Sequence, residues 1–102
     1  WGLLVEPGKM YSQKVPATFK VTMASLGPDV DDKTAARTTV MLRIEDQDDY
    51  ALCSLTAGKL EQQPLELVLM EGETIAFRVS GNCPVHLTGY YVNDHTNMDD
   101  EE

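Results

Sequence analysis

The stretch that decides the fold of this chain is residues 64–91, PLELVLMEGETIAFRVSGNCPVHLTGYY. Apolar and polar residues alternate along it with a period of two, which is typical of β-strands that bury one face. Glu71-Gly72-Glu73 and Gly81-Asn82 interrupt the alternation with residue types that favour turns. We therefore expect three consecutive strands here, at residues 64–70, 74–80 and 85–92.

The same alternation extends towards the N-terminus. Phe19, Val21 and Met23, for example, are expected on one face of a strand, with polar residues between them. Turn residues recur roughly every 8–12 positions, a spacing that favours an antiparallel sandwich or jelly roll over alternating strands and helices. The further expected strands are residues 1–5, 10–15, 19–23, 38–44 and 50–55.

Three positions in these strands carry more detailed expectations. Pro64 is expected at the first position of its strand, where its missing amide hydrogen is tolerated. Val85, Leu87 and Tyr91 are expected on the inner face of the last strand. Gly89 interrupts that strand, and a glycine in such a place often marks a bulge or a close backbone approach.

Acidic residues dominate the charge of the chain. The 102 residues include 17 acids and 8 bases, which gives a formal net charge of −9. Residues 94–102 contain acids but no Lys or Arg, so we expect a β core at 1–93 followed by the start of a disordered acidic tail. A strongly negative field repels nucleic acid and anionic membranes and attracts cationic partners. We expect no direct binding to nucleic acid and none to membranes.

No group of residues predicts catalysis. We find no Gly-rich phosphate loop and no pattern that indicates a nucleophile with its base. Cys83, His86 and His95 come closest to a set of metal ligands, but their spacing matches no zinc pattern. The sequence therefore predicts a binding protein with no enzymatic activity, no cofactor and no metal.

Five segments, taken in order, resemble the nucleoplasmin family of histone chaperones. The chain looks most like the N-terminal nucleoplasmin-like domain of nuclear FKBP-type immunophilins. The segments are WGL at 1–3 with EPGK at 6–9, VTMASL at 21–26, LCSL at 52–55, QPLEL at 63–67 and VHLTGY at 85–90.

The resemblance implies an eight-stranded jelly-roll β-sandwich that assembles as a homopentameric ring. A ring would explain why apolar residues occur on strand faces that should meet solvent, namely Val68, Met70, Tyr90 and Val92. In some family members two pentamers stack into a decamer. The loop that matches the stacking motif of vertebrate nucleoplasmins reads DVDDK at 29–33 and departs from that motif, which leaves the decamer open.

The resemblance also implies a nuclear protein, in some cases nucleolar, that binds core histones through acidic loops and tails. By position, the acidic loop matches Glu45, Asp46, Asp48 and Asp49, and the tail matches Asp99, Asp100, Glu101 and Glu102. The expected mechanism is electrostatic shielding of a basic partner by many weak contacts.

Other interpretations stay open at this point. The domain could be a pentamerisation scaffold for a C-terminal domain, such as a prolyl isomerase, with the acidic segment only a linker. The loop could be an ordinary solvated hairpin and the tail a solubilising end. A monomeric sandwich that binds a sugar or a peptide is a third possibility. The isomerase domain of the immunophilins has no counterpart in these residues, so the resemblance assigns them no isomerase activity.

Overall fold

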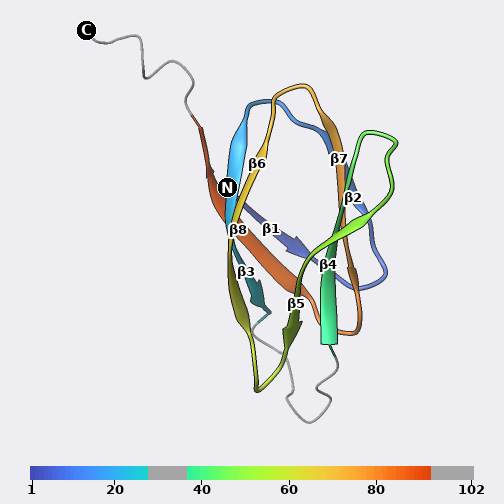
Figure 1. Ribbon diagram of the computed structural model, residues 1–102, viewed down its shortest axis with the longest axis vertical. Helices are drawn as coiled ribbons and strands as arrows, with labels where there is room; N and C mark the ends of the chain where they lie inside the picture. The colour runs from blue at the N-terminus through green and yellow to red at the C-terminus, as the bar shows by residue number, and fades with distance from the viewer. Residues whose placement is uncertain (28–36, 93–102) are drawn as a thin grey trace, which may run out of the picture.

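The computed structural model describes residues 1–27 and 37–92, and within them it shows eight strands in two antiparallel four-stranded sheets (Figure 1). The strands are β1 (Gly2–Val5), β2 (Tyr11–Lys14), β3 (Phe19–Leu26), β4 (Arg37–Ile44), β5 (Tyr50–Thr56), β6 (Gln62–Leu69), β7 (Thr74–Ser80) and β8 (Val85–Tyr91). One sheet has the order β1-β8-β3-β6 and the other β2-β7-β4-β5. This is the jelly-roll order, and it confirms the predicted all-β fold.

The chain changes sheet at nearly every connection. Among the described strands, β4 and β5 are the only consecutive pair in the same sheet. They form a hairpin, and the acidic segment 45–49 is its turn. The acidic loop is therefore attached to one sheet alone, whereas each other connection bridges the two sheets.

The core lies between the two sheets and is made by the inward-facing half of each alternating pattern. Its largest fully buried side chains belong to strands of both sheets, and burial of each contributes about 1.5–3 kcal/mol. They include Phe19, Val21, Leu69 and Leu87 from one sheet and Val40, Leu42, Leu55 and Phe77 from the other. No helix that could cross a membrane occurs in residues 1–27 or 37–92.

Gly89 marks a close backbone approach, as predicted. It pairs with Val21 in β3, while on its other side its N–H donates to the carbonyl oxygen of Trp1 at 2.9 Å. The ammonium group of Trp1 donates in return to the Gly89 carbonyl at 3.0 Å. A Cβ atom at Gly89 would overlap the carbonyl oxygen of Lys20 and lie 2.9 Å from the Cα of Val21. Only glycine fits here without moving β3.

A bulge in β3 lies opposite this glycine and makes one sequence prediction wrong. The register of β3 shifts between Val21 and Met23 against both of its neighbours. The extra residue reverses the phase of the strand, as a β-bulge does. Ala24 is therefore fully buried beyond the bulge, and Met23, predicted to face inwards, is only half-buried.

Pro64 also differs from the prediction, because β6 begins two residues earlier, at Gln62. The proline lies inside the strand and pairs with Met23 at the bulge. Two features make this position tolerable. β6 is an edge strand, and the ladder to β3 is already irregular at this point.

Tyr91 was predicted to face the core but is 55% exposed. Its ring meets Phe19 edge-on with a centroid distance of 6.0 Å. Trp1 stacks on the same Phe19 ring at 4.5 Å. Because Trp1 already covers Phe19, Tyr91 reaches the core only through an edge contact at the end of β8.

The apolar outer face predicted from the sequence is present on the sheet β1-β8-β3-β6. Val68 is 46% exposed, Tyr90 53% and Leu4 40%, and Met70, just after β6, is 53% exposed. Val92, predicted with them, is half-buried. Lys20 pairs with Val68 on one side and Tyr90 on the other. One face of the sandwich is therefore unusually apolar for a solvated sheet.

Candidate functional site

The turn at residues 45–49 is fixed to the rest of the sandwich through Glu45. This residue has a φ of 58°, a left-handed conformation that is uncommon for a residue with a side chain. Two hydrogen bonds to Thr74 hold it there. The Glu45 N–H donates to the Thr74 carbonyl at 2.6 Å, and the Thr74 N–H donates to Glu45 Oε2 at 2.9 Å. The turn is thus tied to the first residue of β7, and the carboxylate of Glu45 already accepts a hydrogen bond.

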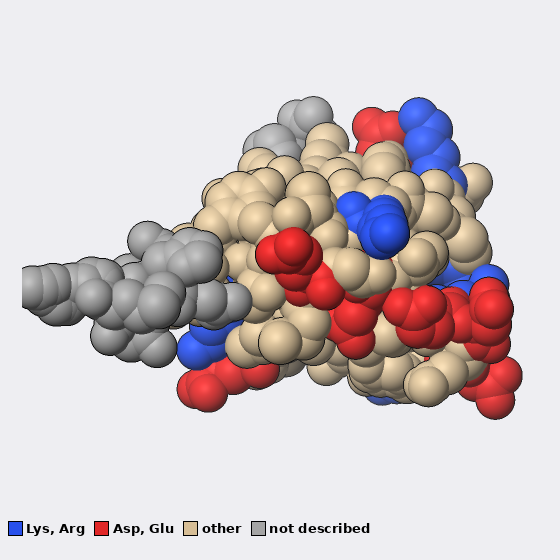
Figure 2. All heavy atoms as spheres, turned by 90° about the horizontal axis from the view of Figure 1, so that it is seen from above, with Lys and Arg blue, Asp and Glu red and all other residues tan. Residues whose placement is uncertain are grey.

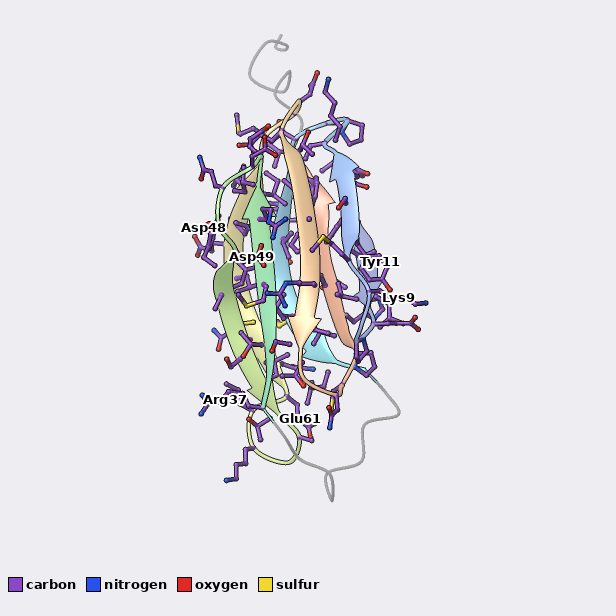
Figure 3. All side chains as sticks on the ribbon, turned by 90° about the vertical axis from the view of Figure 1, so that its right-hand side faces the viewer. Lys9, Tyr11, Arg37, Asp48, Asp49 and Glu61 are labelled. Atoms are coloured by element: carbon purple, nitrogen blue, oxygen red, sulfur yellow. The ribbon has the colours of Figure 1, made fainter. Side chains whose placement is uncertain are left out.

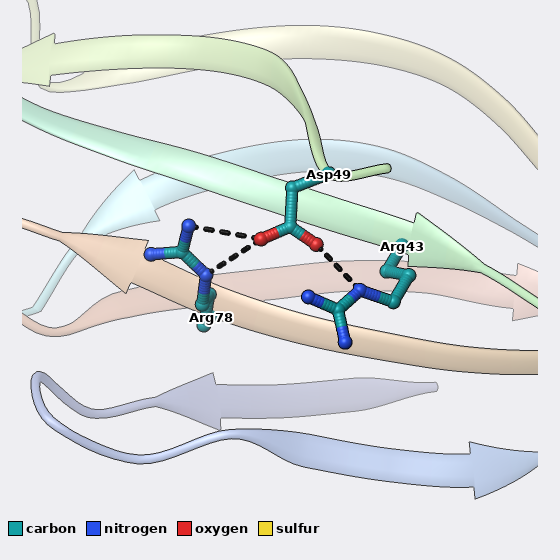
Figure 4. Close-up of polar contacts among 3 residues, drawn as sticks. All are labelled: Arg43, Asp49 and Arg78. Atoms are coloured by element: carbon teal, nitrogen blue, oxygen red, sulfur yellow. Dashed lines mark hydrogen bonds and ion pairs between the residues drawn. The ribbon is translucent and has the colours of Figure 1, made fainter. Parts of the chain in front are cut away.

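Asp49, the last acid of the turn, lies over the outer face of β4 and β7 between two arginines (Figure 4). Arg43 Nε donates to Asp49 Oδ1 at 2.9 Å, and Arg78 Nε donates to Oδ2 at 2.9 Å. Arg78 Nη2 lies 2.9 Å from the same Oδ2. The arginines point outwards because their strand neighbours, Leu42 and Phe77, fill the inner positions. Both oxygens of Asp49 are therefore occupied within the chain.

This contact changes the titration of Asp49, whose side chain is 16% exposed. The hydrogen bond from Arg78 is the largest cause that lowers the pKa of the Asp49 carboxyl, and Arg43 adds to it. Partial desolvation opposes them, because it raises the pKa. The net direction is downwards, so Asp49 stays ionised at any neutral pH.

Asp46 and Asp48 point into solvent instead. Both are exposed, and among the described residues no hydrogen bond or ion pair involves either of them. Figure 3 shows Asp48 at the edge of the molecule and Asp49 over the sheet. Of the four predicted loop residues, Asp46 and Asp48 thus have the geometry of carboxylates presented to a partner.

A second acidic turn, which the sequence marked only as a turn, lies at the same end of the sandwich. It connects β6 and β7 and contains Glu71 and Glu73. Glu73 directly precedes Thr74, to which Glu45 is bonded, and Glu73 Oε1 accepts from the Met70 N–H at 2.8 Å. Figure 2 looks down on this end and shows the carboxylates as a band across it. We call this surface the acidic end: Glu45, Asp46, Asp48, Asp49, Glu71 and Glu73.

The chain also leaves the sandwich at the acidic end. Val92, the last described residue, donates its N–H to the carbonyl oxygen of Thr18 at 2.9 Å. The hydroxyl of Thr18 accepts from the Glu71 N–H at 3.0 Å. Val92 therefore lies beside the β6–β7 turn. Asp99, Asp100, Glu101 and Glu102, predicted in the tail, lie outside the described residues, as does the loop at 29–33.

No other predicted site gathers in the described part of the chain. An opening of about 380 Å³ lies between the edge strands β1 and β2, but it contains none of the predicted site residues. Its lining is Trp1, Gly2, Leu3, Met10, Tyr11, Ser12, Gln13, Ile75 and Phe77. Within residues 1–27 and 37–92 no three His, Cys, Asp or Glu side chains form a group suited to a metal ion. His95, weighed earlier as a ligand, falls outside these ranges.

Two curated relatives resemble this chain over most of its length. The FK506-binding protein 4 of Rhizopus delemar is 46% identical over 92 residues, which is 90% of this chain and 23% of that protein. The 46 kDa FK506-binding nuclear protein of Spodoptera frugiperda is 36% identical over 90 residues, 88% of this chain and 21% of that protein. The chain spans less than a quarter of the length of either relative.

Two solved structures share the fold. The nucleoplasmin-like N-terminal domain of Drosophila FKBP39 superimposes with a TM-score of 0.77 at 25% identity, covering 100% of this chain and 92% of that one. The Drosophila NLP core gives a TM-score of 0.75 at 15% identity, covering 91% of this chain and 97% of that one. That second structure is described as giving insight into pentamer formation and histone binding.

The family can now be assigned. The model of the nucleoplasmin-like domain matches residues 1–92, which is nearly all of the chain and the whole of its described core. The matched unit is this domain and not an isomerase domain, and the relatives are FK506-binding proteins, as the sequence resemblance indicated. The chain belongs to the family of nucleoplasmin-like domains.

Proposed function

We propose that this domain is a histone-chaperone module of a nuclear protein, which binds and shields core histones through its acidic end during chromatin assembly. The observation that carries the proposal is the convergence of two acidic turns with Val92, the residue before the acidic tail. The β4–β5 turn, the β6–β7 turn and Val92 all lie at one end of the sandwich. The proposed histone contacts are Asp46 and Asp48, with Glu45 beside them, and Asp99, Asp100, Glu101 and Glu102 of the tail.

The chemistry of this end suits a basic and poorly structured partner. Each exposed carboxylate that meets a lysine or arginine contributes only about 0–1 kcal/mol. Several carboxylates at one end act together, because after the first contact the others meet their partners at a high effective concentration. The bonds to Thr74 hold the turn in place, so little ordering free energy is lost there on binding.

We also propose that five copies of the domain form a ring, as the resemblance implied. The exposed apolar face of the β1-β8-β3-β6 sheet supports this, because such a face is more typical of a subunit interface than of a solvated sheet. The Drosophila NLP core, which shares the fold, is described in terms of pentamer formation. A ring would carry five acidic ends and so multiply weak contacts. A nuclear location is supported by the name of the Spodoptera relative.

The test compares histone binding by four forms of the chain. The first three are the wild type, a form without residues 94–102, and the variant Asp46→Asn/Asp48→Asn. The fourth, Glu61→Gln, is a control that removes one charge in the β5–β6 connection, at the far end of the sandwich (Figure 3). Binding of core histones is measured by fluorescence anisotropy at about 0.1 and 0.3 M salt, and assembly by light scattering.

We expect the deletion and the double variant each to weaken binding, and Glu61→Gln to change it by less than either. Higher salt should weaken binding by the wild type strongly, because exposed charges are screened over about 8 Å at physiological ionic strength. Unchanged histone binding in both the deletion and the double variant, with assembly intact, would refute the proposal.

The scaffold alternative makes the opposite prediction in the same experiment. It is favoured by one observation, that the chain spans less than a quarter of relatives named as FK506-binding proteins. If the domain only gathers other domains, the wild type should assemble as a pentamer yet bind histones no better than the variants. A monomeric mass would contradict both interpretations.

A further inference from the structure

We propose that Asp49 is a specificity-determining residue, because it occupies an arginine pair that would otherwise bind anions next to the acidic end. Its carboxylate lies between Arg43 of β4 and Arg78 of β7, with both oxygens 2.9 Å from guanidinium nitrogens. The part of this inference that concerns cationic partners rests on the proposed function. The part that concerns anions does not.

The two arginines have the geometry of an anion site. They project from neighbouring strands of one sheet, and their donors converge on a single carboxylate from two sides (Figure 4). Guanidinium groups bind the carboxylates and phosphates of ligands in the same way. The arginine side chains are 43% and 38% exposed, so an anion from solvent could reach them if Asp49 were neutral.

The two arginines lie next to the acidic turn, so their net charge affects how the acidic end attracts a partner. Arg43 is two residues before the acidic turn, and Asp49 is the last acid of that turn. With Asp49 ionised, the charges of Arg43, Arg78 and Asp49 sum to +1. Without the charge of Asp49, the two arginines contribute +2 next to Asp46 and Asp48. Two released guanidinium groups would attract those carboxylates and repel lysine-rich partners. We infer that Asp49 keeps the acidic end selective for cations although it makes no contact with the partner itself.

Asp48 supplies a matched control for charge. Asp48→Asn and Asp49→Asn each remove one negative charge from the same turn, but only the second releases arginine donors. The third variant, Asp49→Asn/Arg43→Gln/Arg78→Gln, removes both the charge and the released donors. A role through the arginines predicts that the triple variant loses the added phosphate binding of Asp49→Asn, whereas a merely structural role of Asp49 predicts that the triple variant keeps it.

The first measurement titrates the full chain with inorganic phosphate at constant ionic strength and follows the arginine Nε–H signals by NMR. We expect Asp49→Asn to bind phosphate about fivefold more tightly than the wild type and Asp48→Asn, since each exposed pair contributes up to about this factor. The signals of Arg43 and Arg78 should move. Equal titrations of the Asp48→Asn and Asp49→Asn variants would overturn the inference, whatever the domain does with histones.

The second measurement uses a lysine-rich peptide as the cationic probe. We expect Asp49→Asn to weaken its binding at least about threefold more than Asp48→Asn does. The triple variant, in which these three side chains carry no charge instead of +1, should bind the peptide at least as tightly as the wild type. Loss without recovery would overturn the role through the arginines. If the wild type binds no such peptide, the proposed function fails, and the phosphate titration alone decides whether Asp49 blocks an anion site.

Discussion

Replacing Gly89 by alanine should destabilise the sandwich far more than the same change at Gly2, the other glycine in a described strand. The new Cβ would overlap the carbonyl oxygen of Lys20 and lie 2.9 Å from the Cα of Val21, and both are backbone atoms that cannot rotate away. β3 and β8 would have to separate, which disturbs the pairing at Val21 in the middle of the sheet. Overpacking costs about 1–3 kcal/mol, and about two weakened ladder hydrogen bonds cost about 1 kcal/mol each. We expect a loss of about 3–5 kcal/mol.

Gly2→Ala is the matched control for this prediction. Gly2 lies in β1, next to β8, and a Cβ there would meet its nearest neighbours at 3.8 and 3.9 Å, which is ordinary van der Waals contact. Urea unfolding is measured at one fixed chain concentration, because assembly would shift the apparent stability. We expect Gly2→Ala to lie within about 0.5 kcal/mol of the wild type. A Gly89→Ala form that differs from Gly2→Ala by less than about 1 kcal/mol would refute the argument from close approach.

Three further predictions follow from the core and the arginine pair. Thr38→Val should stabilise the fold by about 1 kcal/mol in thermal unfolding, because the buried Thr38 hydroxyl has no hydrogen-bond partner in the described residues; a loss would mean that a partner exists. Leu42→Ala should cost about 2–5 kcal/mol in urea unfolding, because the fully buried side chain leaves a cavity. Arg78 and Arg43 lower the pKa of Asp49 in the folded state. Their contacts with Asp49 therefore stabilise the fold above the unfolded pKa of about 3.9, and this stabilisation is lost as the pH falls through the folded pKa. In acid titrations the stability of Asp49→Asn should therefore approach that of the wild type as the pH falls through the folded pKa of Asp49, and a difference that stays constant as the Asp49 carboxyl is protonated would contradict the assigned cause.

The strand pattern could be predicted because each strand buries one face. The predicted strand at 74–80 agrees with β7, and that at 38–44 differs from β4 by one residue. Two of the errors, at Met23 and Pro64, come from one tertiary contact. The approach of Gly89 to β3 goes with a bulge that reverses the phase beyond Val21, so Met23 and Pro64 are not where a regular alternation would place them. A single strand read in isolation contains no sign of its neighbour's irregularity.

The candidate site was only partly visible in the sequence. The run of acids at 45–49 could be found by composition, but its members differ in a way that composition cannot show. Asp48 is exposed, whereas Asp49 is held by arginines that are 6 and 29 positions away in the chain. The one sequence signal for this contact was that Arg43 and Arg78 occupy outward positions in strands with alternating polarity. Their pairing across β4 and β7 depends on the topology.

The first and last strands, β1 and β8, are neighbours in one sheet, and this constrains how the chain folds. β1 pairs only with β8, with Gly2 opposite Thr88 and Val5 opposite Val85, and β2 pairs only with β7. During synthesis at about 5–20 residues per second, the interval between these partners lasts about 4–16 s. β1 stays unpaired for that time and β2 for somewhat less, and their free backbone N–H and C=O groups invite association with other chains. Contacts so distant in sequence also slow folding itself, into the range of about milliseconds to seconds. For this jelly roll the hazardous period is the one before residue 91 is made, and a chaperone that covers the nascent β1 and β2 should raise the yield of folded domain.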